Sequence, residues 1–484
     1  MTLRERAAPL GEAPTRHPLL VVSLVFLIVH LGIAASVPLF DDEAYYALWA
    51  RDLAFGYYDH PPMIAYMIRV GTGLTNETTL GIRLFPVLCF AISGYLVGDI
   101  ARRMPDGGAA VPVLATTLYN LGLLVFALGS FATPDAPSTL FWTAALWATL
   151  RTTDASTETH AAILWWVCAG LFLGLGLLSK FTNAFLAVPM HRAYLLTRLP
   201  YVAMAAALLP VLPYLIWNLQ SDWIGFERQG ARLAVSGYAL RYLGEYAALL
   251  LLAPTPLVTW FAIRALKTPP RQAALLMWSA APLLAYFAYH ASHAQVQANW
   301  IVPLQAHVAI LAAFGLGRLR APRPWIAATL GVASVMSVGL VASAFNPVTP
   351  VGRADNPPNQ TRGWPATRAA IGAVLGETDA TWIATTDYAM TGSLALRFPE
   401  MSVWSVDQLE RYGFRGTFPA EFCAAPGLLI ERVSRPGAIS TTASRFFEVT
   451  GPARPVSRGQ SGVVLMRYTL TPVSRPRSLR LCPS

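Results

Sequence analysis

The sequence is poor in charged residues. Asp, Glu, Lys and Arg make up only 13% of its 484 residues, whereas a soluble globular domain usually carries about a quarter. Hydrophobic residues make up 55%. This balance excludes an ordinary soluble globular protein and predicts an integral membrane protein. The basic residues are scattered over short loops and form no stripe with interleaved aromatic residues, so we expect no nucleic-acid partner.

Cysteines and the motifs of several chemistries are also scarce. The few histidines and cysteines lack metal-ligand spacing, no glycine-rich loop follows a strand, and no serine lies in a nucleophile elbow. We therefore expect no metal and no cofactor. Cys89 and Cys168 lie inside apolar runs, where a thiol acts as a small apolar group. Cys423 and Cys482 lie in the tail, where an oxidising compartment would allow a disulfide; spacing alone leaves pairing and free thiols both open.

Apolar runs long enough to cross a hydrocarbon core recur from residue 17 to residue 345. They predict about eleven transmembrane helices, the first an uncleaved span. The expected spans lie near residues 17–38, 80–100, 109–128, 134–150, 161–178, 183–198, 200–217, 241–264, 273–291, 300–317 and 325–345. Arginine clusters fall in alternate loops, which predicts a cytoplasmic N-terminus and an extracytoplasmic tail.

The tail differs in character from the apolar part. The segment 347–365 is rich in Pro, Asn and Gly, a composition that is typical of a linker. After it, a helix is expected over 367–375 and strands over 382–385, 401–404, 428–433 and 463–470. We therefore expect a transmembrane domain over 1–345 and a small soluble α/β domain over 346–484.

The outside loop 39–79 opens with consecutive acidic residues. Asp41, Asp42 and Glu43 precede Tyr46 and Trp49, which fall on one side of a helix. This spacing predicts an interfacial amphipathic helix with its aromatic rings at the depth of the lipid headgroups. Asp41 and Asp42 are open to two readings, as helix caps or as functional groups. For the Asp42–Glu43 pair we favour function, because adjoining carboxylates at a membrane surface repel each other and are costly to desolvate.

Other polar residues gather at the outside ends of the expected spans. His60, on a stiff turn before two prolines, is either a surface histidine or a phosphate ligand. Arg83 lies at membrane depth, and Arg228 lies in an outside loop, against the charge rule. Asp135 either caps its helix or has a function, and Lys180 either reaches to the interface or has a function. His293 and Asn299 lie at a further outside site, and we expect all these sites to converge on one aqueous face.

These residues occur in an order that resembles the C superfamily of membrane glycosyltransferases, in particular the bacterial branch of the lipid A aminoarabinose transferases and relatives of the protein O-mannosyltransferases. The resemblance is carried by Asp42-Glu43-Ala44-Tyr45-Tyr46, Tyr58-Asp59-His60-Pro61-Pro62-Met63, Arg83, Thr133-Pro134-Asp135-Ala136-Pro137, Ser179-Lys180-Phe181-Thr182 and Asn299-Trp300-Ile301-Val302-Pro303. It departs at His60, where the aminoarabinose branch has a lysine.

The resemblance implies a polyprenyl-phosphate-linked sugar as donor and a site on the periplasmic face of the bacterial inner membrane. It implies Asp42 as the general base and Glu43 as an orienting residue. Because the departing phosphate gains negative charge, cations are expected there, with candidates His60, Arg83, Lys180 and Arg228. Candidate substrate-binding residues are Tyr45, Tyr46, Tyr58, Asp59, Asp135, His293 and Asn299.

The expected acceptor is lipid A, lipopolysaccharide or another envelope glycan, and the sugar is not readable from the sequence. Two alternatives remain at this point. One is an enzyme that glycosylates protein. The other, from a different class, is a lipid or sugar transporter or flippase, although no inverted repeat and no matched pair of broken helices is evident.

Overall fold

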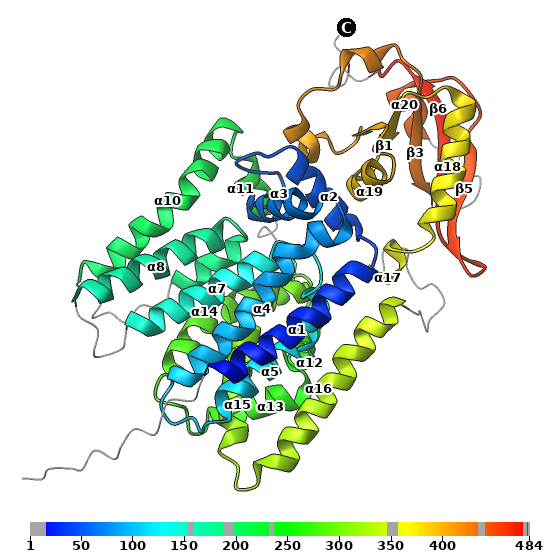
Figure 1. The fold of residues 1–484 in the computed structure, drawn as a ribbon. Helices are drawn as coiled ribbons and strands as arrows, with labels where there is room; N and C mark the ends of the chain where they lie inside the picture. The colour runs from blue at the N-terminus through cyan, green and yellow to red at the C-terminus, as the bar shows by residue number, and fades with distance from the viewer. Residues whose placement is uncertain are drawn as a thin grey trace, which may run out of the picture.

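The computed structural model describes residues 16–152, 159–187, 197–231, 237–345, 357–433, 441–477 and Cys482. Figure 1 shows a bundle of helices and, beside one end of it, a sheet with its own helices. The bundle contains α1 (His17–Ser36), α4 (Thr79–Arg103), α5 (Val111–Asn120), α6 (Leu123–Leu128), α7 (Asp135–Thr152), α8 (Thr159–Leu177), α10 (Leu199–Gln220), α12 (Arg241–Leu252), α13 (Pro256–Ala265), α14 (Ala273–Ala291), α15 (Leu304–Gly317) and α16 (Pro322–Phe345).

Five of the described helices are long and apolar enough to cross a membrane: α1, α4, α10, α14 and α16. Each coincides with an expected span. Two shorter apolar helices, residues Ala161–Leu177 of α8 and Leu304–Gly317 of α15, coincide with two more. Within the described residues, the chain therefore has several apolar helices suited to a multi-pass membrane protein.

The structure differs from the expected spans at two places, and a third span is not tested. The run 241–264 is two helices, α12 and α13, which meet at a bend of 87°. Pro254 and Pro256 lie at that break, where proline cannot continue the backbone hydrogen bonding of a helix. The run 109–128 is likewise split, into α5 and α6, at Leu121 and Gly122. Most of the run 183–198 lies outside the described residues.

The C-terminal part contains six strands in its described residues: β1 (Trp382–Thr385), β2 (Ser402–Ser405), β3 (Gly427–Val433), β4 (Glu448–Val449), β5 (Arg454–Gln460) and β6 (Val463–Ser474). They form one sheet of order β2-β1-β3-β6-β4, with β5 also paired to β6. β2, β1 and β3 are parallel, and β6 runs antiparallel to β3. Four of these strands match the strands expected from the sequence to within a few residues.

Helices cover the sheet. They are α17 (Pro357–Gln360), α18 (Trp364–Thr378), α19 (Tyr388–Arg397) and α20 (Thr441–Phe446), with the short turns η3 (Leu409–Arg415) and η4 (Ala420–Cys423). Because successive strand residues point to opposite faces, Ile383 packs toward α18 and α19, whereas Trp382 packs toward α20 and η4. On this second side a disulfide joins Cys423 to Cys482, which is one of the two possibilities that the sequence left open.

Helix α2 (Asp41–Arg51) lies between the bundle and the sheet, next to α3 (Met63–Thr75) and α19 (Figure 1). Tyr45, Tyr46 and Trp49 on α2 belong to the same buried cluster as the core of the sheet, and Trp49 is 0% exposed. The rings therefore face protein and are not exposed to lipid headgroups; their depth in the membrane stays a prediction. Most of α2 is buried, because α3 and the C-terminal helix α19 both pack on it.

A buried ion pair ties the first turn of α2 to α4. The Arg83 guanidinium donates from Nε to Oε1 of Glu43 at 2.7 Å and from Nη2 to Oε2 at 2.5 Å, and the two side chains are 0% and 1% exposed. Glu43 also accepts from the backbone N–H groups of Phe40 and Ala132. The remaining Arg83 donors bind carbonyl oxygens of residues 34, 37 and 38. Both charges thus have the full set of partners that burial requires.

On its other side α2 touches α19 at a glycine. A Cβ built on Gly392 would lie 2.8 Å from the backbone nitrogen of Tyr45 and 3.0 Å from its Cα. Only a residue without a side chain allows the two helix backbones this approach. Gly392 thus allows the close contact between α2 and α19.

We expect Gly392→Ala to destabilise the packing of α19 on α2 by about 1–3 kcal/mol, the usual effect of an added methyl group in a filled contact. The matched control is Gly372→Ala on α18, where an added Cβ meets nothing within 4 Å. Ala favours a helix over Gly, so this control should stabilise by about 0.5–1 kcal/mol. The stability of both variants is measured by thermal unfolding in detergent and by limited proteolysis of the C-terminal part. Equal behaviour of the two variants would contradict the close-contact assignment.

Arg83→Met should destabilise the protein by about 3–5 kcal/mol, because it leaves the Glu43 carboxylate buried without its cation. Adding Glu43→Gln to Arg83→Met removes that charge and should recover part of the loss. Arg69→Met, at an exposed arginine, is the control. Thermal unfolding in detergent distinguishes these cases, and an Arg83→Met protein as stable as the control would exclude a structural role for the pair.

Candidate active site

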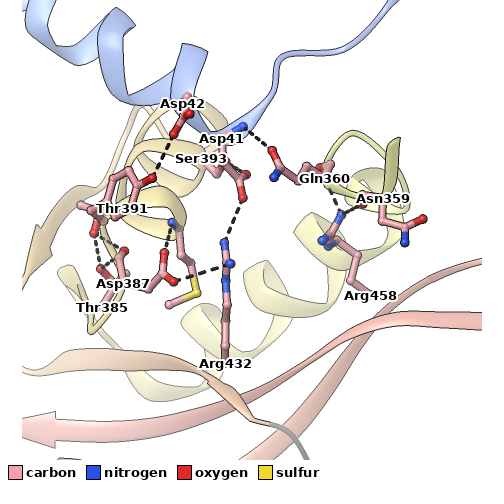
Figure 2. Close-up of polar contacts among 12 residues, drawn as sticks. Asp41, Asp42, Asn359, Gln360, Thr385, Asp387, Thr391, Ser393, Arg432 and Arg458 are labelled. Carbon is pink, nitrogen blue, oxygen red and sulfur yellow. Dashed lines mark hydrogen bonds and ion pairs between the residues drawn. The ribbon is translucent and has the colours of Figure 1, made fainter. Parts of the chain in front are cut away.

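The three carboxylates at the start of α2 point to three different partners. Glu43 turns into the bundle toward Arg83. Asp41 turns to the C-terminal part, where its carboxylate accepts from Ser393 Oγ at 2.6 Å and from Arg432 Nη2 at 3.0 Å (Figure 2). Its backbone N–H donates to Gln360. The side chain of Asp41 therefore joins two parts of the chain instead of capping its own helix.

Asp42 lies between these two and is exposed. Its Oδ1 accepts a hydrogen bond of 3.0 Å from the Tyr388 hydroxyl, the first residue of α19. The protein around Asp42 raises the pKa of this carboxyl by desolvation; Tyr388 and Arg411 oppose that shift, while Asp41 and Asp59 add to it. A carboxylate with a raised pKa that is still reachable from solvent suits a general base.

A second cluster forms around Asp59, in the loop between α2 and α3. Arg411 Nη1 lies 2.6 Å from Oδ2, Arg228 Nε lies 3.4 Å from Oδ1, and the Tyr45 hydroxyl lies 3.3 Å from Oδ2. Both guanidinium groups also lie over the ring of Tyr58, at 5.3 Å and 5.8 Å. Among the described residues, two guanidinium groups thus meet at the one carboxylate of Asp59.

A third cluster joins the ends of α7, α8 and η2 (Ala298–Ile301). Lys180 Nζ lies 2.6 Å from Oδ1 of Asp135, and Asn299 Nδ2 lies 2.8 Å from Oδ2. Asp135 is 3% and Lys180 8% exposed. The structure thus brings together Asp135, Lys180 and Asn299, as expected, and it uses the Asp135 carboxylate for these contacts and not as a helix cap.

Tyr46 is buried on the same helix as Asp42. Burial raises its pKa well above the ordinary value, and the negative charges of Asp42, Asp59 and Asp135 raise it further. Its ring packs edge-on against His60, with 6.4 Å between the ring centres. Arg411 links the first two groups, because it pairs with Asp59 and lies over the ring of Tyr388, which donates to Asp42.

Three predicted site residues lie elsewhere. Arg83 was expected at the donor phosphate, but its donors are taken up by Glu43 and by backbone carbonyls, so it has none to offer a ligand. Glu43 is likewise held inside the protein. His293 contacts Ser292 and the rings of Tyr238 and Tyr289, away from the three clusters. Burial and full hydrogen bonding make the first two residues structural.

The C-terminal contribution to the site was not predicted from the sequence. Tyr388, Arg411 and Arg432 lie more than 300 residues from the carboxylates that they contact. No motif marks them, and an exposed tyrosine or arginine in a soluble domain is unremarkable by itself. In the described ranges, no three His, Cys, Asp or Glu side chains are placed to hold a metal ion together.

Residues 59–217 match the model of a family described as dolichyl-phosphate-mannose-protein mannosyltransferase. The chain is 30% identical over 193 residues to the lipid A galacturonosyltransferase RgtD of Rhizobium johnstonii, a match that covers 38% of this chain and 39% of that protein. It is 29% identical over 214 residues to the undecaprenyl phosphate-alpha-4-amino-4-deoxy-L-arabinose arabinosyl transferase of Pseudomonas aeruginosa, over 40% of this chain and 34% of that one. The matched stretches thus span little more than a third of these relatives.

The fold is similar to a solved structure over almost its full length. The crystal structure of ArnT from Cupriavidus metallidurans bound to undecaprenyl phosphate superposes with a TM-score of 0.64, covering 94% of this chain and 97% of that one at 14% identity. The chain therefore has the fold of ArnT and carries, in residues 59–217, the sequence pattern of the dolichyl-phosphate-mannose-protein mannosyltransferases, so that its resemblance to the C superfamily of membrane glycosyltransferases is confirmed.

Proposed function

We propose that this protein transfers a sugar from a polyprenyl-phosphate donor to an envelope glycolipid or glycan, with Asp42 as the general base. One observation carries the proposal: the exposed Asp42 carboxylate accepts a hydrogen bond from Tyr388, and Arg411, which lies over the ring of Tyr388, binds Asp59 together with Arg228. The first arrangement suits removal of a proton from a hydroxyl group, and the second suits a phosphate.

The relatives support the choice of substrates. One is named as a lipid A transferase and others as transferases that use an undecaprenyl-phosphate sugar. We propose lipid A, or a related part of lipopolysaccharide, as the acceptor. An enzyme that transfers the sugar to protein would leave lipid A unmodified in the assay described below, and that result would contradict this choice of acceptor.

We propose a bacterial inner-membrane location with about eleven spans over residues 1–345 and a periplasmic α/β domain over 346–484. Two observations favour this orientation. Arginine clusters fall in alternate loops, and α2 and α3 lie at the end of the bundle next to the sheet (Figure 1). In this orientation α2 and α3 lie along the periplasmic interface, and the donor lipid reaches the site from the outer leaflet.

The reaction that we propose is a displacement at the anomeric carbon. The acceptor oxygen forms the new bond to the anomeric carbon as its proton passes to Asp42. The bond between this carbon and the phosphate oxygen breaks, and its electron pair stays on the phosphate oxygen. Negative charge therefore grows on the phosphate. Arg228, with Arg411 beside it, stabilises that charge, and His60 adds a hydrogen-bond donor.

The remaining side chains bind and orient. Asp135 holds Lys180 and Asn299 together, so that the ammonium and the amide act on the donor from fixed positions. The Tyr45 hydroxyl binds Asp59 and so holds the loop that carries Tyr58. The Tyr46 ring packs against His60 of the same loop. We assign Glu43 and Arg83 to the support of α2 and give His293 no role in the reaction.

Asp42→Asn should lower kcat by about a thousandfold or more, because the amide cannot take the proton of the acceptor. Donor binding should stay near its wild-type level. Asp52→Asn, at an exposed carboxylate just past the end of the same helix, is the control and should keep wild-type activity. The assay uses purified protein in detergent with lipid A and undecaprenyl phosphate bearing an acidic, a basic or a neutral sugar in turn. Substantial turnover by Asp42→Asn would contradict the base assignment.

Arg228→Gln should reduce kcat/KM for the donor by about tenfold to a hundredfold, since one charge-assisted contact to the phosphate is lost. Arg241→Gln removes an exposed arginine at the start of α12 and is the matched control. The kcat/KM of each variant is measured from initial rates at varied donor concentration. If the two variants have equal kcat/KM, the phosphate does not bind at Arg228.

A further inference from the structure

Asp42 is held by a residue from the other end of the chain. It belongs to α2, yet the side chain that donates to it, Tyr388, follows 346 residues later. In the part of the chain that the structure describes, this is the one hydrogen bond to the Asp42 carboxylate. Only Oδ1 is engaged, and Oδ2 remains open.

Tyr388 is itself fixed on two sides. Asp387 caps α19 by accepting from the backbone N–H of Met390 at 2.9 Å, and its carboxylate lies 3.5 Å from Arg432, which also binds Asp41 (Figure 2). The Tyr412 hydroxyl donates to the backbone oxygen of Tyr388 at 2.6 Å. The start of α19 is therefore tied both to α2 and to η3.

The ring of Tyr388 is also held in place. The Arg411 guanidinium lies over it at 4.0 Å, and the edge of Tyr45 packs on it with 5.3 Å between centroids. Burial and the nearby Asp42 raise the pKa of the Tyr388 hydroxyl well above its ordinary value. The hydroxyl thus keeps its proton over the physiological range and acts as a permanent donor.

We infer that Tyr388 is a positioning residue of the reaction: its hydroxyl holds Oδ1 of Asp42 and so presents Oδ2 to the acceptor hydroxyl. This inference rests on the proposed function. A carboxylate on a short side chain otherwise turns freely about its terminal torsion, and a fixed donor on one oxygen selects the orientation of the other. The C-terminal part would then supply a component of the catalytic machinery.

Tyr388 would also set the pH range of the reaction. The groups that face Asp42 are Tyr388 and Arg411, which favour its ionised form, and Asp41 and Asp59, which oppose it. Loss of the Tyr388 hydroxyl removes a donor to the carboxylate, so the pKa of Asp42 should rise. Because the base must be ionised to accept a proton, activity should then be lost at a higher pH as the solution is acidified.

The test is Tyr388→Phe, assayed as kcat against pH with lipid A and the donor that the wild type uses. We expect the acid limb to move up by roughly one pH unit, kcat at the optimum to fall about tenfold, and the donor KM to stay unchanged. Tyr412→Phe is the matched control. It also removes a hydroxyl from the packing around α19, but that hydroxyl does not touch Asp42, so its pH profile should match the wild type.

A second substitution covers the case in which the phenylalanine variant does not fold. Difluorotyrosine at position 388 keeps the shape of the ring and makes its hydroxyl a stronger donor, which should move the acid limb to lower pH. An acid limb that stays in place in both Tyr388 variants, or that moves equally in Tyr412→Phe, would overturn the inference.

The failure of this inference is distinguishable from failure of the proposed function. Wild-type protein that consumes none of the lipid-phosphate sugars would exclude the function itself. The titration of Asp42 can still be followed without turnover, by infrared difference spectra between the wild type and Asp42→Asn. An Asp42 titration that is equal with and without the Tyr388 hydroxyl would reject the positioning role on its own.

Discussion

The buried pair of Glu43 and Arg83 is the interaction on which the site depends. Both side chains are almost fully removed from solvent, and each is surrounded by hydrogen-bond partners from α1, α4 and the loop before α7. A desolvated charge is tolerated only with such a complete set of partners. The pair therefore fixes the first turn of α2 in a single place, and the adjacent Asp42 is fixed with it.

The same turn of α2 is held from the opposite side by the C-terminal part. Asp41 binds Ser393 and Arg432, and the backbones of α2 and α19 meet at Gly392. Three consecutive carboxylates thus have three different environments. Two are neutralised by arginines and serve the structure, and the one between them remains open to solvent. A rigid helix turn with one available carboxylate is a suitable support for chemistry at a membrane surface.

Charge is distributed unevenly around this support. Asp135 and Lys180 balance each other, whereas Asp59 meets both Arg228 and Arg411. Both guanidinium groups also lie over the ring of Tyr58, in a region where burial weakens screening by water. An anionic leaving group would be stabilised there, at a short distance from the proposed base.

Local sequence determined the elements of this protein, because hydrophobic length, proline and strand alternation act within a few residues. Spans such as α4 and α14, the strands β1 and β3, and the acidic start of α2 were all readable from it. The bend between α12 and α13 shows the limit, since an apolar run hides a break at two prolines. Only the tertiary structure decided which of Asp41, Asp42 and Glu43 stays accessible, and that Arg83 supports the fold. Arg83 meets Glu43 and the carbonyl groups before α2 only after the helices have packed. The accessibility of Asp42 depends on Tyr388 and Arg432, which lie hundreds of residues away and leave no local pattern.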